Sequence, residues 1–186
     1  MKTAVSLQLV SPAKKIAFGA LFAALCCIGT VIVQIPAPQG GFLNVGDVFV
    51  LLSGWCLGPI YGSIAAAVGS ALADIVVGFP LYAPATFIIK GLDALVAYLL
   101  WAFFKKWIAK DTLDFLPRLF SAVFAESVMV LGYALYDYLL ADWGAAILNM
   151  PFNVIQACVC IVGGVLLCTA LTRYKQTRNL FSHLEK

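Results

Sequence analysis

The stretch that decides the fold is "DVFVLLSGWCLGPIYGSIAAAVGSALAD", residues 47–74. It is apolar along most of its length and carries charged residues only at its two ends. Gly58 and Pro59 interrupt it near the middle, and such a pair marks a turn. The stretch can therefore form one long kinked membrane span or two short spans that fold back on each other.

The distribution of basic residues favours two spans. Cytoplasmic loops of membrane proteins collect Lys and Arg. Apart from Lys90, these residues form three clusters, at positions 2, 14 and 15, at 105, 106, 110 and 118, and at 173, 175, 178 and 186. Two spans place all three clusters on one side of the membrane, whereas a single span would put the middle cluster outside.

Composition sets the class of protein. The chain has 186 residues, of which 63% are hydrophobic and 11% charged, whereas soluble domains carry roughly 25% charge. A transmembrane helix needs about 20 apolar residues. We therefore predict an all-α membrane protein with six transmembrane helices and cytoplasmic N- and C-termini. We expect one domain over residues 1–186, with helices at 13–33, 44–57, 60–78, 84–104, 118–140 and 150–172.

The second and third predicted helices form a short hairpin. Residues 43–78 supply about 54 Å of helix, and two full crossings need about 60 Å. The hairpin should leave a depression open to the outside. The preceding loop, "QIPAPQGGFLNVGD", is too rich in Pro and Gly for a helix. It can form a lid over the depression, with Asn44 and Asp47 above the site, or be a plain connector.

Polar residues follow one face of each of the last three predicted helices. Ionisable residues in membrane segments usually face a bundle interior and mark substrate paths. The three faces consist of Thr86, Lys90 and Asp93, then Glu126, Tyr133 and Asp137, then Asn149, Asn153, Gln156 and Cys160.

Two interpretations of these faces remain open. They can be internal glue, with Lys90 paired to Asp93, Asp74 or Glu126, because an unpaired buried charge is costly. They can also form a ligand site, since amides and aromatic rings suit a small, planar, heteroatom-rich molecule. The candidate substrate-binding residues are Asn44, Asp47, Tyr82, Thr86, Lys90, Tyr133, Asp137, Asn149, Asn153 and Gln156. An enzyme is disfavoured, and neither a catalytic residue nor a metal site is expected, because the only histidine is His183 in the polar tail.

The first predicted helix carries a stripe of small residues. Ala13, Ala17, Ala20 and Ala24 lie on one face, and such faces let helices approach closely in lipid. The stripe can pack within the chain or dock an external partner. A second stripe, Gly62, Ala66, Gly69 and Ala73, is expected to pack within the chain.

Four motifs carry a family resemblance that covers nearly the whole chain. They are "LNVGDVFVLLSGWCLGPIYG", "YAPATFIIKGL", "GYALYDYLL" and "PFNVIQ", in that order. Together with six helices and a Pro/Gly-rich first loop, they resemble the substrate-binding S components of energy-coupling factor (ECF) vitamin transporters. The resemblance is to the branch that includes the riboflavin and hydroxymethylpyrimidine or pyridoxine types.

The resemblance implies a mechanism and partners. Such a protein is a multi-pass protein of the bacterial cell membrane and binds a vitamin from outside. It docks on a transmembrane coupling protein that carries two cytoplasmic ATPases. The alanine stripe would be the docking surface. Family sites would match Asn44, Lys90, Tyr133, Asn153 and Gln156. The chain has no G-x-x-x-x-G-K-[ST] motif, so ATP and Mg²⁺ would bind the partner ATPases and no cofactor is expected here. The lipid bilayer is a further partner, and nucleic acid is not.

The ligand is the least constrained prediction. Pyridine and pyrimidine rings suit tyrosine walls with amide donors and acceptors, so we favour the hydroxymethylpyrimidine or pyridoxine type. Pantothenate, whose carboxylate could pair with a lysine, and riboflavin are the alternatives. An autonomous small-molecule carrier is the other alternative for the whole protein.

Overall fold

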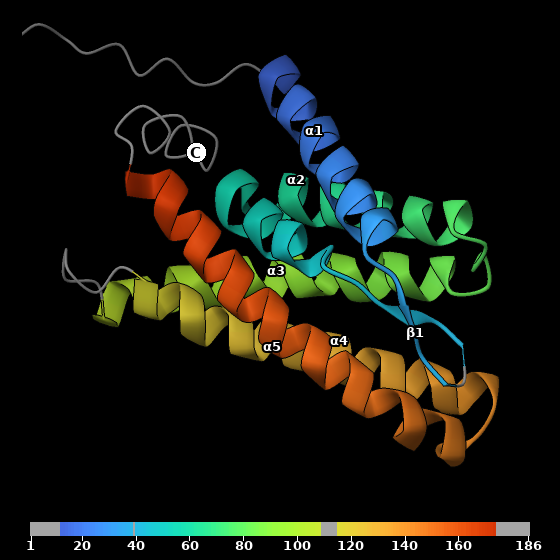
Figure 1. Ribbon diagram of the computed structural model, residues 1–186. Helices are drawn as coiled ribbons and strands as arrows, with labels where there is room; N and C mark the ends of the chain where they lie inside the picture. The colour runs from blue at the N-terminus through green and yellow to red at the C-terminus, as the bar shows by residue number, and fades with distance from the viewer. Residues whose placement is uncertain (1–11, 39, 109–114, 174–186) are drawn as a thin grey trace, which may run out of the picture.

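Five long helices make up the protein in a computed structural model, which describes residues 12–38, 40–108 and 115–173 (Figure 1). All five are long and apolar enough to cross a membrane. They are α1 (Pro12–Ile32), α2 (Asp47–Val76), α3 (Ala83–Ile108), α4 (Phe115–Leu140) and α5 (Trp143–Arg173). The predicted all-α membrane fold is confirmed. Lys2, Lys110, Lys175, Arg178, His183 and Lys186 lie outside the described residues.

Helix α2 is bent sharply at Gly58. This residue has a φ of 81°, a value that glycine adopts readily and other residues rarely do. The Ser53 hydroxyl donates a hydrogen bond to the Gly62 carbonyl at 3.0 Å, so the two halves of α2 double back on each other. The expected count of six helices differs from the five found here. The predicted spans 44–57 and 60–78 correspond to the two arms of α2, which are separated only by the non-helical Gly58.

The loop between α1 and α2 contains a small antiparallel strand pair that the sequence did not predict. Strand β1 (Ile35–Pro36) pairs with β2 (Phe42–Leu43). The turn uses Gly40 and Gly41, whose φ values are 100° and 75°. The loop is therefore a folded hairpin that lies across one end of the helices (Figure 1).

Close helix packing explains the small residues of α2. A Cβ at Gly69 would collide with the backbone carbonyl of Ala23 on α1, and a Cβ at Gly54 would collide with that of Ala94 on α3. Small residues permit this approach of backbones in membrane helices. The second small-residue stripe thus packs within the chain at Gly69, as expected.

The two ends of the bundle differ in charge. At the Gly58 end, Lys15 lies 5.8 Å from the Tyr61 ring centre and Lys105 lies 4.4 Å from that of Trp101. The loops before α2, α3 and α5 gather at the opposite end (Figure 1), which we call the loop end. Because basic residues mark the cytoplasmic side, the loop end faces outward, as the charge clusters predict.

Three helix starts differ from the expected bounds by three residues or more. Helix α5 begins at Trp143 rather than at 150, so Asn149 and Pro151 lie inside it. The Asp142 carboxylate accepts a hydrogen bond from the Ala145 amide at 3.0 Å, which satisfies a free donor of the first turn. Helix α4 begins at Phe115 rather than at 118, and helix α2 begins at Asp47 rather than at 44.

Candidate ligand-binding site

A pocket opens at the loop end, between the strand-pair loop and the outer parts of α2 to α5. It holds about 450 Å³ of unfilled space, part of it open to solvent. Eight of the candidate residues line it, namely Asn44, Tyr82, Thr86, Tyr133, Asp137, Asn149, Asn153 and Gln156. The fold therefore brings together most of the residues that the polar helix faces singled out.

Five further residues line the pocket and were not among the candidates. They are Ala37, Gly40, Gly41, Phe42 and Asp74. The first four belong to the strand-pair loop, and their signal in the sequence was only their place beside Asn44. Asp74 had a clearer signal, because it is an acid at the end of an apolar run.

Asp47 and Lys90 are absent from the pocket lining. Asp47 is 0% exposed and Lys90 is 2% exposed. The Lys90 ammonium forms an ion pair with Asp47 Oδ1. This buried ion pair joins α2 to α3, and we call it the brace. Direct contact of Asp47 or Lys90 with a ligand stays a prediction.

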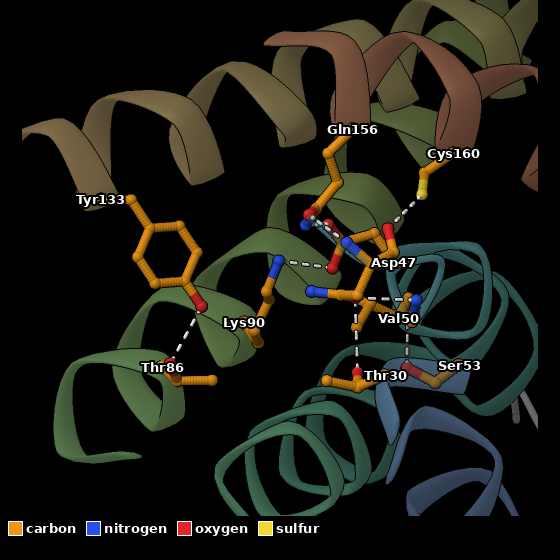
Figure 2. A network of polar contacts seen from close by, with 11 residues as sticks. Thr30, Asp47, Val50, Ser53, Thr86, Lys90, Tyr133, Gln156 and Cys160 are labelled. Carbon is orange, nitrogen blue, oxygen red and sulfur yellow. Dashed lines mark hydrogen bonds and ion pairs between the residues drawn. The ribbon is translucent and has the colours of Figure 1, made fainter. Parts of the chain in front are cut away.

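Gln156 connects this brace to the first loop (Figure 2). Its Nε2 donates to Asp47 Oδ2 at 2.5 Å, and its Oε1 accepts from the Asn44 backbone N–H at 2.8 Å. The Asn44 side chain in turn accepts from the Gly46 N–H at 2.9 Å. One amide on α5 therefore holds both the loop and the start of α2.

Tyr133 lies beside the brace and also lines the pocket. The Lys90 ammonium lies 5.2 Å from the centre of its ring, within the range of a cation–π contact. Its hydroxyl shares a hydrogen bond with Thr86 Oγ1 at 2.9 Å (Figure 2). The ring is thereby fixed by α3 on two sides.

Asp137 lines the pocket and forms hydrogen bonds with residues of two other segments. Its two oxygens accept from the Tyr82 hydroxyl at 2.9 Å and from the Asn149 amide at 3.0 Å. The Asn149 amide also donates to the Gly40 carbonyl at 3.2 Å. Burial and the bond to Asp137 raise the pKa of the Tyr82 phenol, so the phenol stays a donor at neutral pH.

The partner of Lys90 corrects one expectation. The pairing acid is Asp47 rather than Asp93, Asp74 or Glu126. Asp93 and Glu126 are 0% and 1% exposed, and none of their carboxylate oxygens has a hydrogen-bond partner among the described residues. No group of His, Cys, Asp and Glu in the described part of the chain could hold a metal ion.

The alanine stripe of α1 is not buried inside the chain. Ala13, Ala17, Ala20 and Ala24 are all exposed, whereas neighbouring Ala23 packs against Gly69. Helix α1 lies at the edge of the bundle (Figure 1). The stripe therefore remains available as an outward-facing surface.

Comparison with known proteins supports the resemblance drawn from the four motifs. A model of the family described as "ECF-type riboflavin transporter, S component" matches residues 11–173. A Pyrococcus woesei protein, described as "Uncharacterized protein in gap 3'region", is 36% identical over 138 residues, which are 74% of this chain and 87% of the relative. A solved structure of the S component of a bacterial ECF transporter has a TM-score of 0.69 and 23% identity. The match covers 88% of this chain and 98% of that one.

These findings define what kind of protein this is. The solved structure shares the fold, and the family match extends over all five helices. S components are membrane-embedded, substrate-binding parts of transporters, so the chain is a transport protein and not an enzyme, and it works with other ECF components. The chain belongs to the family of ECF-type riboflavin transporter S components.

Proposed function

We propose that the pocket at the loop end binds one water-soluble vitamin or vitamin precursor from outside the cell. The observation that carries this is the convergence of eight predicted polar residues on one outward-facing pocket. Two tyrosine rings supply apolar walls, and four amide side chains, those of Asn44, Asn149, Asn153 and Gln156, supply donors and acceptors. Such a mixture fits a small planar ligand with several heteroatoms.

Riboflavin is the ligand that we propose first. The description of the matching family names it, and its isoalloxazine ring is planar with a pyrimidine-dione edge of N–H and carbonyl groups. The hydroxymethylpyrimidine or pyridoxine type is the second candidate, because its smaller planar ring also carries hydrogen-bonding heteroatoms. Pantothenate has less support, since the lysine expected to pair with its carboxylate is engaged by Asp47.

For uptake, we propose that α1 docks on an ECF transmembrane coupling protein that works with two ATPase subunits. The exposed stripe of Ala13, Ala17, Ala20 and Ala24 would form the contact, because small residues permit close helix approach. Ala20→Trp should abolish uptake by the complete transporter and leave vitamin binding intact. Loss of binding as well would assign the stripe a role inside the chain.

A thermal-shift screen of the purified chain with a panel of B-type vitamins tests the binding function. A ligand at 100 times its dissociation constant should add about 2.7 kcal/mol to stability. We expect riboflavin to raise the unfolding temperature at low micromolar concentration or below. No stabilisation by any member would contradict the proposal, and uptake into liposomes by this chain alone would favour an autonomous carrier.

A further inference from the structure

The charges on the pocket wall are uneven. Two carboxylates, Asp74 and Asp137, line the pocket, and no Lys or Arg of the described residues does. Asp137 already accepts hydrogen bonds at both oxygens, from Tyr82 and Asn149. Of the two pocket carboxylates, Asp74 is therefore the one with an oxygen left to accept a further hydrogen bond.

Asp74 lies near the end of α2 and is 6% exposed. The backbone carbonyl of Asp74 accepts a hydrogen bond from the Phe79 N–H at 2.7 Å. The Oδ2 atom is buried and has no hydrogen-bond partner among the described residues. One acceptor of a buried side chain on the pocket wall is thus left unsatisfied.

The basic residue inside the bundle does not satisfy this oxygen. Lys90 is held by the ion pair with Asp47 and by the Tyr133 ring. A buried acceptor without a partner costs free energy, and a hydrogen bond to a charged group is stronger than one between neutral groups. A ligand that brings its own donor to Oδ2 would remove that cost on binding.

We propose that Asp74 is a specificity-determining residue, which accepts a hydrogen bond from an N–H or O–H group of the ligand. The inference rests on the proposed vitamin-binding function and adds a selection rule to it. Ligands that place a donor beside Asp74 bind, and ligands that place a carboxylate or phosphate there are rejected, because a second buried negative charge has no counter-ion. For riboflavin the donor is either the ring N3–H or a hydroxyl of the ribityl chain.

The test compares ligand analogues on matched variants of the full chain. The dissociation constants of riboflavin, 3-methylriboflavin and lumiflavin are measured by flavin fluorescence for the wild type, Asp74→Ala and Asp142→Ala. The first analogue lacks the ring N3–H, and the second lacks the ribityl hydroxyls. Asp142 lies outside the pocket lining, so its variant controls for the loss of a carboxylate.

We expect Asp74→Ala to weaken riboflavin binding about tenfold to a hundredfold and Asp142→Ala to leave it unchanged. One analogue should bind the wild type weakly and lose little further affinity in Asp74→Ala, which identifies the donor. Asp74→Asn, which keeps one acceptor, should give an intermediate loss.

Four results would overturn the inference. If Asp74→Ala binds riboflavin as tightly as the wild type, the selection rule fails while the proposed function stands. If the variant loses equal affinity for riboflavin and both analogues, Asp74 does not accept a bond from either donor. If the wild type binds no vitamin, the proposed function fails and the inference fails with it. Tight binding of pantothenate by the wild type would contradict the rule without any variant.

Discussion

The loop end and the Gly58 end of the same helices are built on different principles. At the loop end the buried contacts are polar, and they join segments that are distant in the chain, such as Asn44 with Gln156. At the Gly58 end the buried contacts are mainly apolar and centre on Trp55 and Trp101, which are 2% and 3% exposed. One exception there is the Trp55 indole N–H, which donates to the Ala97 carbonyl and the Ser121 hydroxyl.

The two kinds of buried contact correspond to two different roles of the two ends. Apolar packing needs no matched partners and tolerates lipid nearby, so it suits the half that only has to hold together. Buried polar groups cost free energy unless each is paired, and such groups persist at the loop end where they position a pocket. Changes at the Gly58 end should therefore alter stability alone, and changes at the loop end should alter ligand affinity.

The largest effect is expected for the ion pair at the loop end. Lys90→Met leaves the Asp47 carboxylate buried without its counter-ion, which should cost about 3–5 kcal/mol of stability. Because Asp47 also holds Gln156, ligand affinity should fall too. Thermal unfolding and vitamin titration of the purified variant measure both effects.

A double variant provides the control for that prediction. Lys90→Met with Asp47→Leu removes both charges, and stability should recover toward the wild-type value because no lone charge remains. Affinity should stay low, since the Gln156 anchor is gone. A single variant as stable as the wild type would mean that the pair is not a brace.

The next effect is expected at the Gly58 end. Trp55→Phe keeps an aromatic ring but removes the bonds to Ala97 and Ser121, which measure 3.2 and 3.1 Å. The loss should be about 1–3 kcal/mol of stability, with no change in the dissociation constant of the vitamin. Weaker binding in a still-folded variant would break the division between the two ends.

A smaller effect is expected from one amide of the pocket. Asn153 lines the pocket and is partly exposed, so Asn153→Ala should weaken vitamin binding about twofold to tenfold. The unfolding temperature of the ligand-free protein should not change. Equal affinity in calorimetric titrations of the variant and the wild type would remove Asn153 from the site.

The smallest effect is expected for the unpartnered acids between the two ends. Glu126→Gln replaces a buried carboxylate, which has no hydrogen bond to a described residue, with a neutral amide that costs less to bury. Stability should be unchanged or higher, with any loss below about 0.5 kcal/mol. Vitamin affinity should stay at the wild-type value. A large loss of stability would show that Glu126 is part of the glue that holds the helices together.

Much of the fold could be predicted from the sequence because its signals are local. Apolar runs indicate the spans, and clustered Lys and Arg indicate their direction. The strand pair at Ile35–Pro36 and Phe42–Leu43 was missed because two-residue strands leave no periodic pattern. The start of α5 was placed at 150 rather than at Trp143 because proline favours the first turn of a helix, whereas this helix accommodates Pro151 in its interior.

The sequence predicted which residues of each helix face the candidate site, but not which of them pair with one another. Thr86, Tyr133 and Gln156 follow the spacing of helix faces, and the structure brings them to one pocket. Which acid would meet Lys90 depends on how α2 packs against α3. Asp47 lies 43 positions away in sequence, and no periodic pattern encodes that contact.

The central claim is that the loop end, and not the Gly58 end, receives the vitamin. Hydrogen–deuterium exchange of the purified chain with and without saturating riboflavin tests it most directly. We predict slower exchange in the strand-pair loop, around residues 40–46, and in α5 around 149–156, with no change around Gly58. Protection confined to the Gly58 end, or an unchanged loop in the presence of bound vitamin, would contradict the account.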